Sequence, residues 1–278
     1  MSGLLAWKGP TPSFGALPQK SAPEVGMNCS KASILSLLVL CTALPALAET
    51  APGAAPATAL ENCQALQNAG VALSGTYWIR PSGGSPLTAY CDMETNGGGW
   101  TLVYNSVLGV NTTEFWNIAH WDRFGRRGQP RIESLFYDGS IYPHGRSYMD
   151  IIEDLMGKSV VVLVAEASGI DPYSMRFISP RFISGNPGIY SAQFAAGWSA
   201  PDFDGDLWSE QNCALNYGNV TQHYGICWNY NLGMDADAPI YDGGMGPHLY
   251  SGTATSVGLH SDGSAYTRVR RISRFVKW

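Results

Sequence analysis

The placement of cysteines constrains the fold of this chain more than any other feature. The 278 residues include six cysteines, at positions 29, 41, 63, 91, 213 and 227. In an exported protein an even number of cysteines predicts disulfides, whereas C-x-x-C pairs predict zinc or redox sites. The sequence contains no C-x-x-C. Whether these cysteines form a disulfide framework therefore depends on whether the chain is exported.

Residues 27–48 have the pattern of a secretory signal peptide. Lys31 precedes an apolar run that extends from Ile34 to Leu40, and Ala46-Leu47-Ala48 supplies small residues for cleavage. The apolar run is too short to span a membrane comfortably. We therefore expect a secreted, extracellular protein, or one exported to another oxidising compartment, with no stable membrane span once the signal is removed.

The regions on either side of this signal carry no core pattern. Residues 1–26 are rich in proline, and Met27 stands where a start residue is expected, so we interpret 1–26 as an over-extended N-terminus. Residues 49–61 are rich in Ala, Pro and Thr and predict a flexible linker. No internal repeat divides the remainder, so 62–278 is expected to be one domain.

Removal of the signal leaves four cysteines, Cys63, Cys91, Cys213 and Cys227. They can pair in three ways. Joining near neighbours in sequence would enclose two short segments, and each disulfide would then contribute about 3–4 kcal/mol in the loop-entropy model. The residues by themselves leave all three pairings open.

Composition favours a loop-rich domain with β-structure. Apolar residues make up 45% of the chain, which is enough for a real core, while only 14% are charged and glycine occurs 32 times. The net charge of −5 gives no electrostatic argument for nucleic-acid binding. Local patterns predict a helix over 62–68 that ends at Gly70, an antiparallel meander of strands over 77–79, 87–91 and 100–104, a helix over 147–155, and a buried strand over 159–165.

A basic segment closes the chain over 267–278. It alternates apolar residues with Arg268, Arg270, Arg271, Arg274 and Lys277. This pattern predicts a terminal strand whose outer face is charged. A patch for polyanions is the competing interpretation.

Two motifs carry a family resemblance. Residues 90–101 read Tyr-Cys-Asp-Met-Glu-Thr-Asn-Gly-Gly-Gly-Trp-Thr, and the segment 202–206, Asp-Phe-Asp-Gly-Asp, is followed by Asn212-Cys213-Ala214, Cys227 and Asn231-Leu232-Gly233. Both resemble fibrinogen-related domains, the C-terminal globular modules of fibrinogen, ficolins and tachylectins and, more distantly, intelectins. The resemblance implies an α+β fold, a fibrinogen C-terminal-like globular domain with an antiparallel N-terminal meander, a central mixed sheet and a loop-rich calcium and ligand region. It also implies two short disulfides, Cys63–Cys91 and Cys213–Cys227.

The aspartate-rich segment is the expected Ca²⁺ site. The resemblance implies side-chain ligands from Asp204 and Asp206 with carbonyl oxygens from Trp208 and Glu210, or from Ser209 or Gln211, because the loop is one residue longer than in the family. Calcium takes six to eight oxygen ligands at about 2.3–2.6 Å. An EF-hand is excluded, since Leu207 and Cys213 occupy the places of its glycine and glutamate. A solvated Asp-rich turn is the competing interpretation.

The expected ligand pocket lies beside the second disulfide. The resemblance implies that it takes acetyl groups and is lined by Tyr224, Ile226, Cys227, Trp228 and Asn229, with Tyr241, His248 and Tyr250 as further wall residues. Aromatic faces and backbone amides suit an acetamido group, which combines a methyl with a carbonyl acceptor. The sequence departs from the family at Trp228, where a histidine is common. Ordinary aromatic core packing is the competing interpretation.

Catalytic motifs are missing from the sequence. It has no G-x-S-x-G elbow, H-E-x-x-H, Walker loop or G-x-G-x-x-G. We therefore expect no enzyme but a calcium-supported, lectin-like domain that binds carbohydrate or an acetylated glycan. A protein-binding adhesion or assembly module is one alternative, and a secreted carbohydrate-active hydrolase is another.

Overall fold

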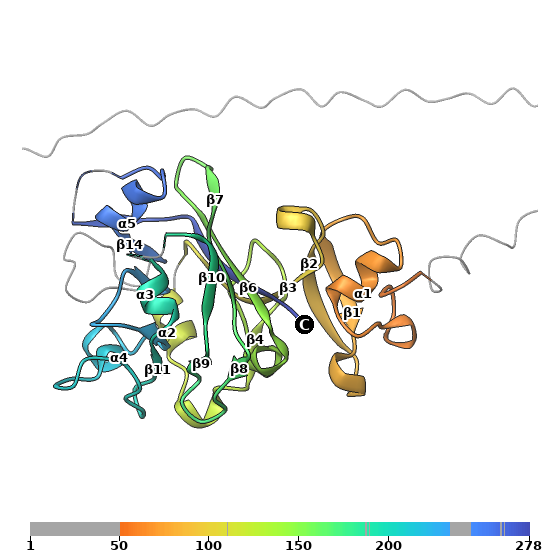
Figure 1. Cartoon of the computed structure of the whole chain (residues 1–278), viewed down its shortest axis with the longest axis horizontal. Coiled ribbons are helices and arrows are strands. Elements are labelled where there is room, and N and C mark those ends of the chain that lie inside the picture. Colours follow the sequence, from red (N-terminus) through yellow and green to blue (C-terminus); the bar gives the residue numbers. More distant parts are fainter. Residues whose placement is uncertain are drawn as a thin grey trace, which may run out of the picture. The chain divides into compact units, whose positions relative to one another are not determined.

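An antiparallel sheet of nine strands is the central element of the fold (Figure 1). The structure is a computed structural model and describes residues 51–278 except 110, 187, 189, 234–245, 262 and 264. Its α-helices are α1 (Cys63–Asn68), α2 (Thr112–Trp116), α3 (Tyr190–Phe194), α4 (Cys213–Asn216) and α5 (Ser251–Ser256), and its 3-10 helices are η1 (Pro56–Thr58), η2 (Pro81–Gly83), η3 (Thr95–Gly97), η4 (His120–Asp122) and η5 (Gly139–His144). Its strands are β1 (Gly75–Ile79), β2 (Leu87–Asp92), β3 (Trp100–Val107), β4 (Arg126–Gly128), β5 (Phe136–Asp138), β6 (Ser147–Glu153), β7 (Ser159–Glu166), β8 (Gly169–Ile170), β9 (Phe177–Ile178), β10 (Arg181–Gly185), β11 (Gly197–Ser199), β12 (Gln222–Tyr224), β13 (Tyr230–Asn231), β14 (His248–Tyr250), β15 (Tyr266–Arg268) and β16 (Arg271–Lys277).

The strand order of the large sheet is β1-β2-β3-β16-β6-β7-β10, with β5 pairing to β3 and β4 to β5. The last strand of the chain is therefore central, because β16 lies between β3 and β6. Every pairing between the described strands is antiparallel, so the expectation of a mixed sheet is wrong, while the antiparallel meander β1-β2-β3 is confirmed.

Aromatic side chains dominate the main core. This cluster lies between the sheet and the side on which Figure 1 shows the helices α2, α3 and α5, and its rings include Trp116, Tyr148 and Phe194. Burial of such rings supplies about 25 cal/mol per Å² of apolar area removed from water.

None of the helices in the described ranges is long and apolar enough to cross a membrane.

An ion pair lies inside this core. Arg274 of β16 and Asp150 of β6 are both fully buried, and the guanidinium donates to both carboxylate oxygens, from Nε to Oδ1 at 2.7 Å and from Nη2 to Oδ2 at 2.6 Å. The hydroxyls of Tyr142 and Tyr230 accept from the same guanidinium at 3.3 and 3.2 Å. The expected charged outer face of the last strand is therefore wrong at Arg274, whose charge is neutralised inside the protein.

The helix expected over 147–155 is a second error, since this segment forms β6. Its residues Tyr148 to Ile152 are buried and pair with β16 on one side and β7 on the other. A short apolar run has no clear period, so spacing alone does not separate a helix from a strand that is covered on both faces. The neighbouring prediction of a strand over 159–165 is confirmed by β7.

The N-terminal region contains the first disulfide. Cys63 and Cys91 are bonded with a Cα–Cα distance of 5.4 Å and lie in a cluster of buried residues between α1 and β2. Helix α1 is confirmed, and Asn62 caps it by accepting from the backbone N–H of Ala65 at 2.8 Å. Gly98 has φ of +66°, and a Cβ there would collide with the Met93 carbonyl, which explains the glycine run of the family motif.

The segment predicted as a flexible linker differs from that expectation where it is described. Gly53 is buried and accepts a hydrogen bond from Trp78 N at 2.8 Å, and Leu60 accepts one from Arg80 N at 2.7 Å. Backbone N–H groups of Trp78 in β1 and of Arg80, the residue after β1, therefore hold this segment at Gly53 and Leu60. The expected signal over 27–48 and the segment 1–26 lie outside the described residues.

Candidate ligand-binding and metal site

Residues 197–233 form what we call the distal region. The second disulfide joins two loops within it. Cys213 and Cys227 are bonded with a Cα–Cα distance of 5.5 Å. Cys213 begins α4, whose N-cap Asn212 accepts from Ala214 N at 2.8 Å and donates from Nδ2 to Ala200 O at 2.9 Å. The pairing implied by the family resemblance is therefore present in both disulfides.

Two buried amide side chains hold the loop that follows Cys227. Gln193 Oε1 accepts from the backbone N–H groups of Asn229 and Tyr230, and its Nε2 donates to the carbonyls of His223 and Tyr230. Gln222 donates to the Tyr230 carbonyl and accepts from Leu232 N, each at 2.8 Å. These side chains replace the backbone ladder that the short strands here do not provide. Sequence reasoning missed both, because a lone glutamine has no distinguishing pattern.

An aromatic surface lies next to this disulfide, and we call it the Trp228 face. It consists of Tyr217, Trp228, Tyr250 and Tyr266. The Trp228 ring lies 4.9 Å from that of Tyr266 and 6.0 Å from that of Tyr217, and Tyr250 contacts Tyr266 at 6.3 Å. Trp228 and Tyr266 are partly exposed and Tyr250 is 48% exposed, so the face is open to solvent. Tyr217 and Tyr266 were missed by sequence reasoning, since only the fold brings them to Trp228.

The residues predicted for the pocket divide into surface and core. Ile226 is 78% exposed and Trp228 is partly exposed, whereas Tyr224 is buried and donates its hydroxyl to Val220 O at 2.6 Å. The Asn229 backbone N–H is taken by Gln193. Cys227 is nearly buried within the small cluster around the disulfide, and Tyr241 lies outside the described residues.

His248 belongs to the interior as well. It is fully buried, and its Nδ1 donates to the Gly233 carbonyl at 3.1 Å. Burial lowers the pKa of His248 to about 4, with a further contribution from the positive charge of Arg268. The ring is therefore neutral at physiological pH. Its contact with Gly233 holds β14 in position, and the buried ring is not part of the surface that a ligand would meet.

The aspartate loop lies directly before α4. Asp206 accepts three hydrogen bonds, from Trp208 N at 2.8 Å to Oδ1 and from Ser199 Oγ at 3.0 Å and Cys213 N at 2.9 Å to Oδ2. It thereby links β11, the loop and the disulfide. The Asp202 carboxylate has a different partner, since its Oδ1 accepts from His120 N at 2.7 Å. Only Asp204 and Asp206 remain as a carboxylate pair.

This pair fits the donor chemistry of Ca²⁺. Burial and the negative charge of Asp206 both raise the pKa of Asp204, so the two carboxylates repel each other in the absence of a cation. Asp206 keeps lone pairs beyond its three hydrogen bonds, and carboxylate oxygens are the ligands that Ca²⁺ prefers. Within the described ranges no cluster of three or more His, Cys, Asp or Glu side chains occurs, so the remaining ligands would have to be carbonyls and water.

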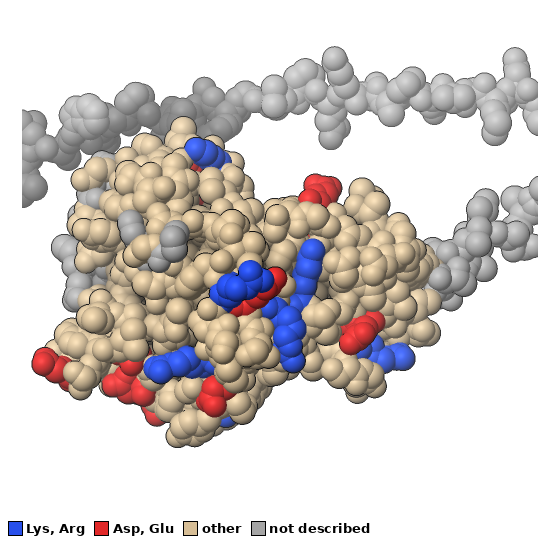
Figure 2. Space-filling model, viewed as in Figure 1, with Lys and Arg blue, Asp and Glu red and all other residues tan. Residues whose placement is uncertain are grey.

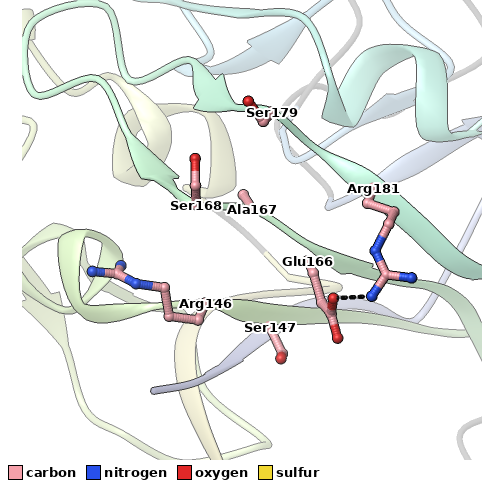
Figure 3. Close-up of a pocket in the computed structure, with 7 residues that line it drawn as sticks. All are labelled: Arg146, Ser147, Glu166, Ala167, Ser168, Ser179 and Arg181. Atoms are coloured by element: carbon pink, nitrogen blue, oxygen red, sulfur yellow. Dashed lines mark hydrogen bonds and ion pairs between the residues drawn. The ribbon is translucent and has the colours of Figure 1, made fainter.

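A hollow of about 410 Å³ lies elsewhere, at the ends of β6, β7 and β10 (Figure 3). Figure 3 shows Glu166 between Arg146 and Arg181, and the Glu166 carboxylate is paired with Arg181. Arg146 donates from Nη1 to the carbonyls of Pro143 and Gly145. The charged groups of the hollow are thus engaged by the protein itself, and we assign no ligand to it.

Comparisons with known proteins agree with this architecture. Residues 59–139 match the family model for the C-terminal globular domain of fibrinogen beta and gamma chains. Fibrinogen-like protein A of Apostichopus parvimensis is 44% identical over 187 residues, which is 64% of this chain and 62% of that protein. Ryncolin-4 of Cerberus rynchops is 38% identical over 184 residues, 63% of this chain and 51% of that protein. Veficolin-1 of Varanus komodoensis is 35% identical over 80 residues, 29% of this chain and 34% of that protein.

The chain spans less than two thirds of the length of each of these curated relatives. Solved structures extend the likeness of fold. The fibrinogen-like globe domain of human ANGPTL6 superposes with a TM-score of 0.54 at 22% identity and covers 78% of this chain and 95% of that domain. Residues 59–139 thus match the fibrinogen C-terminal domain, and the chain is similar to fibrinogen-like and ficolin-like proteins and has the fold of a fibrinogen-like globe.

Proposed function

We propose that this chain is a secreted recognition protein that binds carbohydrate or acetylated surface groups at the Trp228 face, with support from Ca²⁺ at Asp204 and Asp206. The observation that carries the proposal is the exposed group of four aromatic rings beside the Cys213–Cys227 disulfide. Catalysis is not proposed, because fibrinogen-like domains are recognition modules.

The chemistry of the face suits an acetamido sugar. Indole and phenol rings offer apolar faces to a methyl group and to the C–H bonds of a pyranose, and the tyrosine hydroxyls offer hydrogen bonds to its polar edge. Trp228 occupies the position where the family often has histidine. Stacking against Trp228 would therefore replace a hydrogen bond from an imidazole, and binding would not depend on the protonation of a residue at this position.

Calcium is proposed to act on the loop and not on the ligand. The Asp206 carboxylate accepts from the backbone N–H of Cys213, so a cation held by Asp204 and Asp206 would fix the start of α4. Carbonyl oxygens of Trp208 and Glu210 are the proposed further ligands. Because Tyr217 follows α4, ordering of this helix would also order one ring of the Trp228 face.

Titration calorimetry with N-acetylglucosamine tests the proposal, with glucosamine as the control that lacks the acetyl group. We expect binding of the acetylated sugar only, weakened by chelation of calcium. Trp228→Ala should reduce affinity by about tenfold or more, since a stacked aromatic contributes on the order of 1 kcal/mol or more, while Trp228→Phe should retain part of it. A wild-type protein that binds neither acetylated sugars nor acetylated amines would refute the proposal.

A protein-binding role is a second candidate, because exposed aliphatic side chains also gather in the distal region. Leu207, Leu215 and Ile226 are 53%, 56% and 78% exposed. Aliphatic groups of this kind are typical of contacts with protein and contribute little to sugar binding. Partner capture that is lost in Leu215→Asp and unaffected by Trp228→Ala would favour this second function over the first.

A further inference from the structure

A second group of aromatic rings consists of residues other than those of the Trp228 face, and we call it the Tyr173 platform. His120, Tyr173 and Phe203 come from three separate segments. His120 stacks on Phe203 with ring centroids 3.9 Å apart and planes at 18°. Tyr173 lies perpendicular to both, at 5.1 Å from His120 and 5.4 Å from Phe203. No motif in the sequence links these residues, so only the fold brings them together.

Hydrogen bonds fix the backbone around these rings. His120 Nε2 donates to the Tyr173 carbonyl at 2.7 Å, and the His120 backbone N–H donates to Asp202 Oδ1 at 2.7 Å. Arg123 joins the same segments by donating to the Pro172 and His120 carbonyls, each at 2.9 Å. Because the rings are already held in place, a ligand would not have to order them on binding.

The platform is open to solvent on one side. Tyr173 is 64% exposed, and the stacked pair can cover at most one face of its ring. Trp121, the residue after His120, is 78% exposed. Large rings in solvent have a cost in free energy, so a pre-arranged group of them indicates a surface that something else covers.

Charge around the platform limits what that ligand can be. Asp202 precedes Phe203 and accepts from the His120 backbone N–H, and Asp171 forms the turn that carries Tyr173 by accepting from Tyr173 N and Ser174 N. Figure 2 shows acidic side chains at the lower edge of the region that Figure 1 labels α4, with a basic group beside them near β11. Carboxylates repel anionic polymers, whereas they accept hydrogen bonds from hydroxyl groups. An aromatic face with an acidic rim therefore matches a neutral, polyhydroxylated ring.

We propose that the Tyr173 platform is a second carbohydrate site, which stacks a neutral pyranose on Tyr173 and accepts its hydroxyls at Asp202, the carboxylate that also holds the His120 backbone N–H. Gluco-configured rings suit it best, because their equatorial substituents leave axial C–H bonds exposed on both faces. The site shares its ligand class with the proposed function but none of its aromatic residues. It requires no acetyl group, which separates the two sites experimentally.

Cellotetraose, a neutral β-linked glucose oligomer without acetyl groups, is the probe. Titration calorimetry should detect binding to wild type, and Tyr173→Ala should weaken it by about tenfold or more. Tyr173→Phe keeps the ring and should retain most of the affinity. Trp228→Ala should bind cellotetraose as wild type does. Melting curves of the variants check that each remains folded, which we expect because Tyr173 is largely exposed.

Three results would overturn the second site. The first is a wild type that shows no binding of cellotetraose at millimolar concentrations, which would leave the platform to a protein contact. The second is unchanged affinity in the folded Tyr173→Ala variant. The third is loss of cellotetraose binding in Trp228→Ala, which would place both sugars at the Trp228 face. Since N-acetylglucosamine binding is measured separately, failure of one site does not decide the other.

Discussion

The central sheet and the distal region are stabilised in different ways. In the sheet, β16 and β6 pair continuously from Arg271 with Glu153 to Lys277 with Ser147. In the distal region, β11 and β12 share only three residue pairs, from Gly197 with Tyr224 to Ser199 with Gln222. In the sheet, backbone groups bond to one another in regular ladders. In the distal region, side chains bond many of the backbone groups, and a disulfide adds a covalent link.

This difference separates stability from recognition. In the sheet, buried polar groups are paired in backbone ladders and in the Arg274–Asp150 ion pair. The rigidity of the sheet therefore does not depend on what the surface binds. The distal region depends on a few side chains, among them Gln193 and Asp206, each of which joins several backbone groups. Loops held in this way can present aromatic rings in irregular positions, which a regular strand cannot do. Four predictions test this contrast.

The largest effect is expected in the sheet, at Arg274. Arg274→Met leaves the Asp150 carboxylate buried with only the Tyr190 hydroxyl, at 3.1 Å, as a side-chain donor. Removing one partner of a buried ion pair costs about 3–5 kcal/mol, so urea denaturation should show a loss of this size. The double variant Arg274→Met/Asp150→Leu removes both charges and should recover part of it. A single variant as stable as wild type would mean that the pair is not buried in solution.

The second prediction concerns the distal disulfide. Replacing Cys213 and Cys227 with serine removes a link across a sequence separation of 14 residues, for which the loop-entropy model gives about 3 kcal/mol. We expect the loss to be local, because the sheet does not depend on this loop. Hydrogen exchange should accelerate in residues 206–233 while β6, β7 and β16 remain protected, and sugar binding at the Trp228 face should disappear.

The matched variant replaces Cys63 and Cys91, which lie in the cluster that supports α1 and β2. Here we expect faster exchange in the N-terminal region and unchanged sugar binding. Equal loss of binding in both serine pairs would show that the two regions are coupled, and the contrast drawn above would fail.

The same contrast explains what could be predicted from sequence. The cap of α1 at Asn62 and the glycine run at Gly98 follow local rules, so they could be predicted from a few adjacent residues. The helix expected at 147–155 was wrong because β6 is covered on both faces and has no alternation to reveal it. Arg274 was expected at the surface for a related reason, since its partner Asp150 lies far away in the sequence.

The candidate site, too, could be predicted only where a local motif marks its residues. Its disulfide and its aspartates belong to a motif and were expected, whereas Tyr217 and Tyr266 reach Trp228 only through tertiary packing. His248 was expected in the pocket wall, but its contact with Gly233 lies in the interior. Residue type alone does not say whether an aromatic or histidine side chain points to solvent.

The third prediction is a loss of stability in acid that arises from two buried histidines. Burial, together with the charge of Arg274, lowers the pKa of His223 to about 3, and His248 has a pKa of about 4. Below about pH 6.5 the unfolded chain binds protons at these histidines and the folded chain does not, so stability falls with pH until the folded pKa values are reached. Each histidine contributes up to about 1.4 kcal/mol per pH unit.

The measurement is urea denaturation at steps from pH 7 to pH 4.5. His248→Gln should make the decline shallower even if it lowers stability at pH 7, because it removes one titrating group. A wild type whose stability is the same at pH 7 and pH 5 would contradict the buried, neutral state of both histidines.

The smallest effect is expected at the aspartate loop, and its sign depends on calcium. Asp206 accepts hydrogen bonds from Ser199, Trp208 and Cys213, so its replacement should destabilise the protein with or without the ion. Asp204 is largely exposed, and its pKa is raised by partial desolvation and by the negative charge of Asp206. In chelator, Asp204→Asn should therefore leave the melting temperature unchanged or raise it slightly, because it removes a repulsion. In calcium it should lower the melting temperature relative to wild type, because it removes a ligand. If wild type melts at the same temperature in calcium and in chelator, no ion is held here, and the loop is ordered by Asp206 alone.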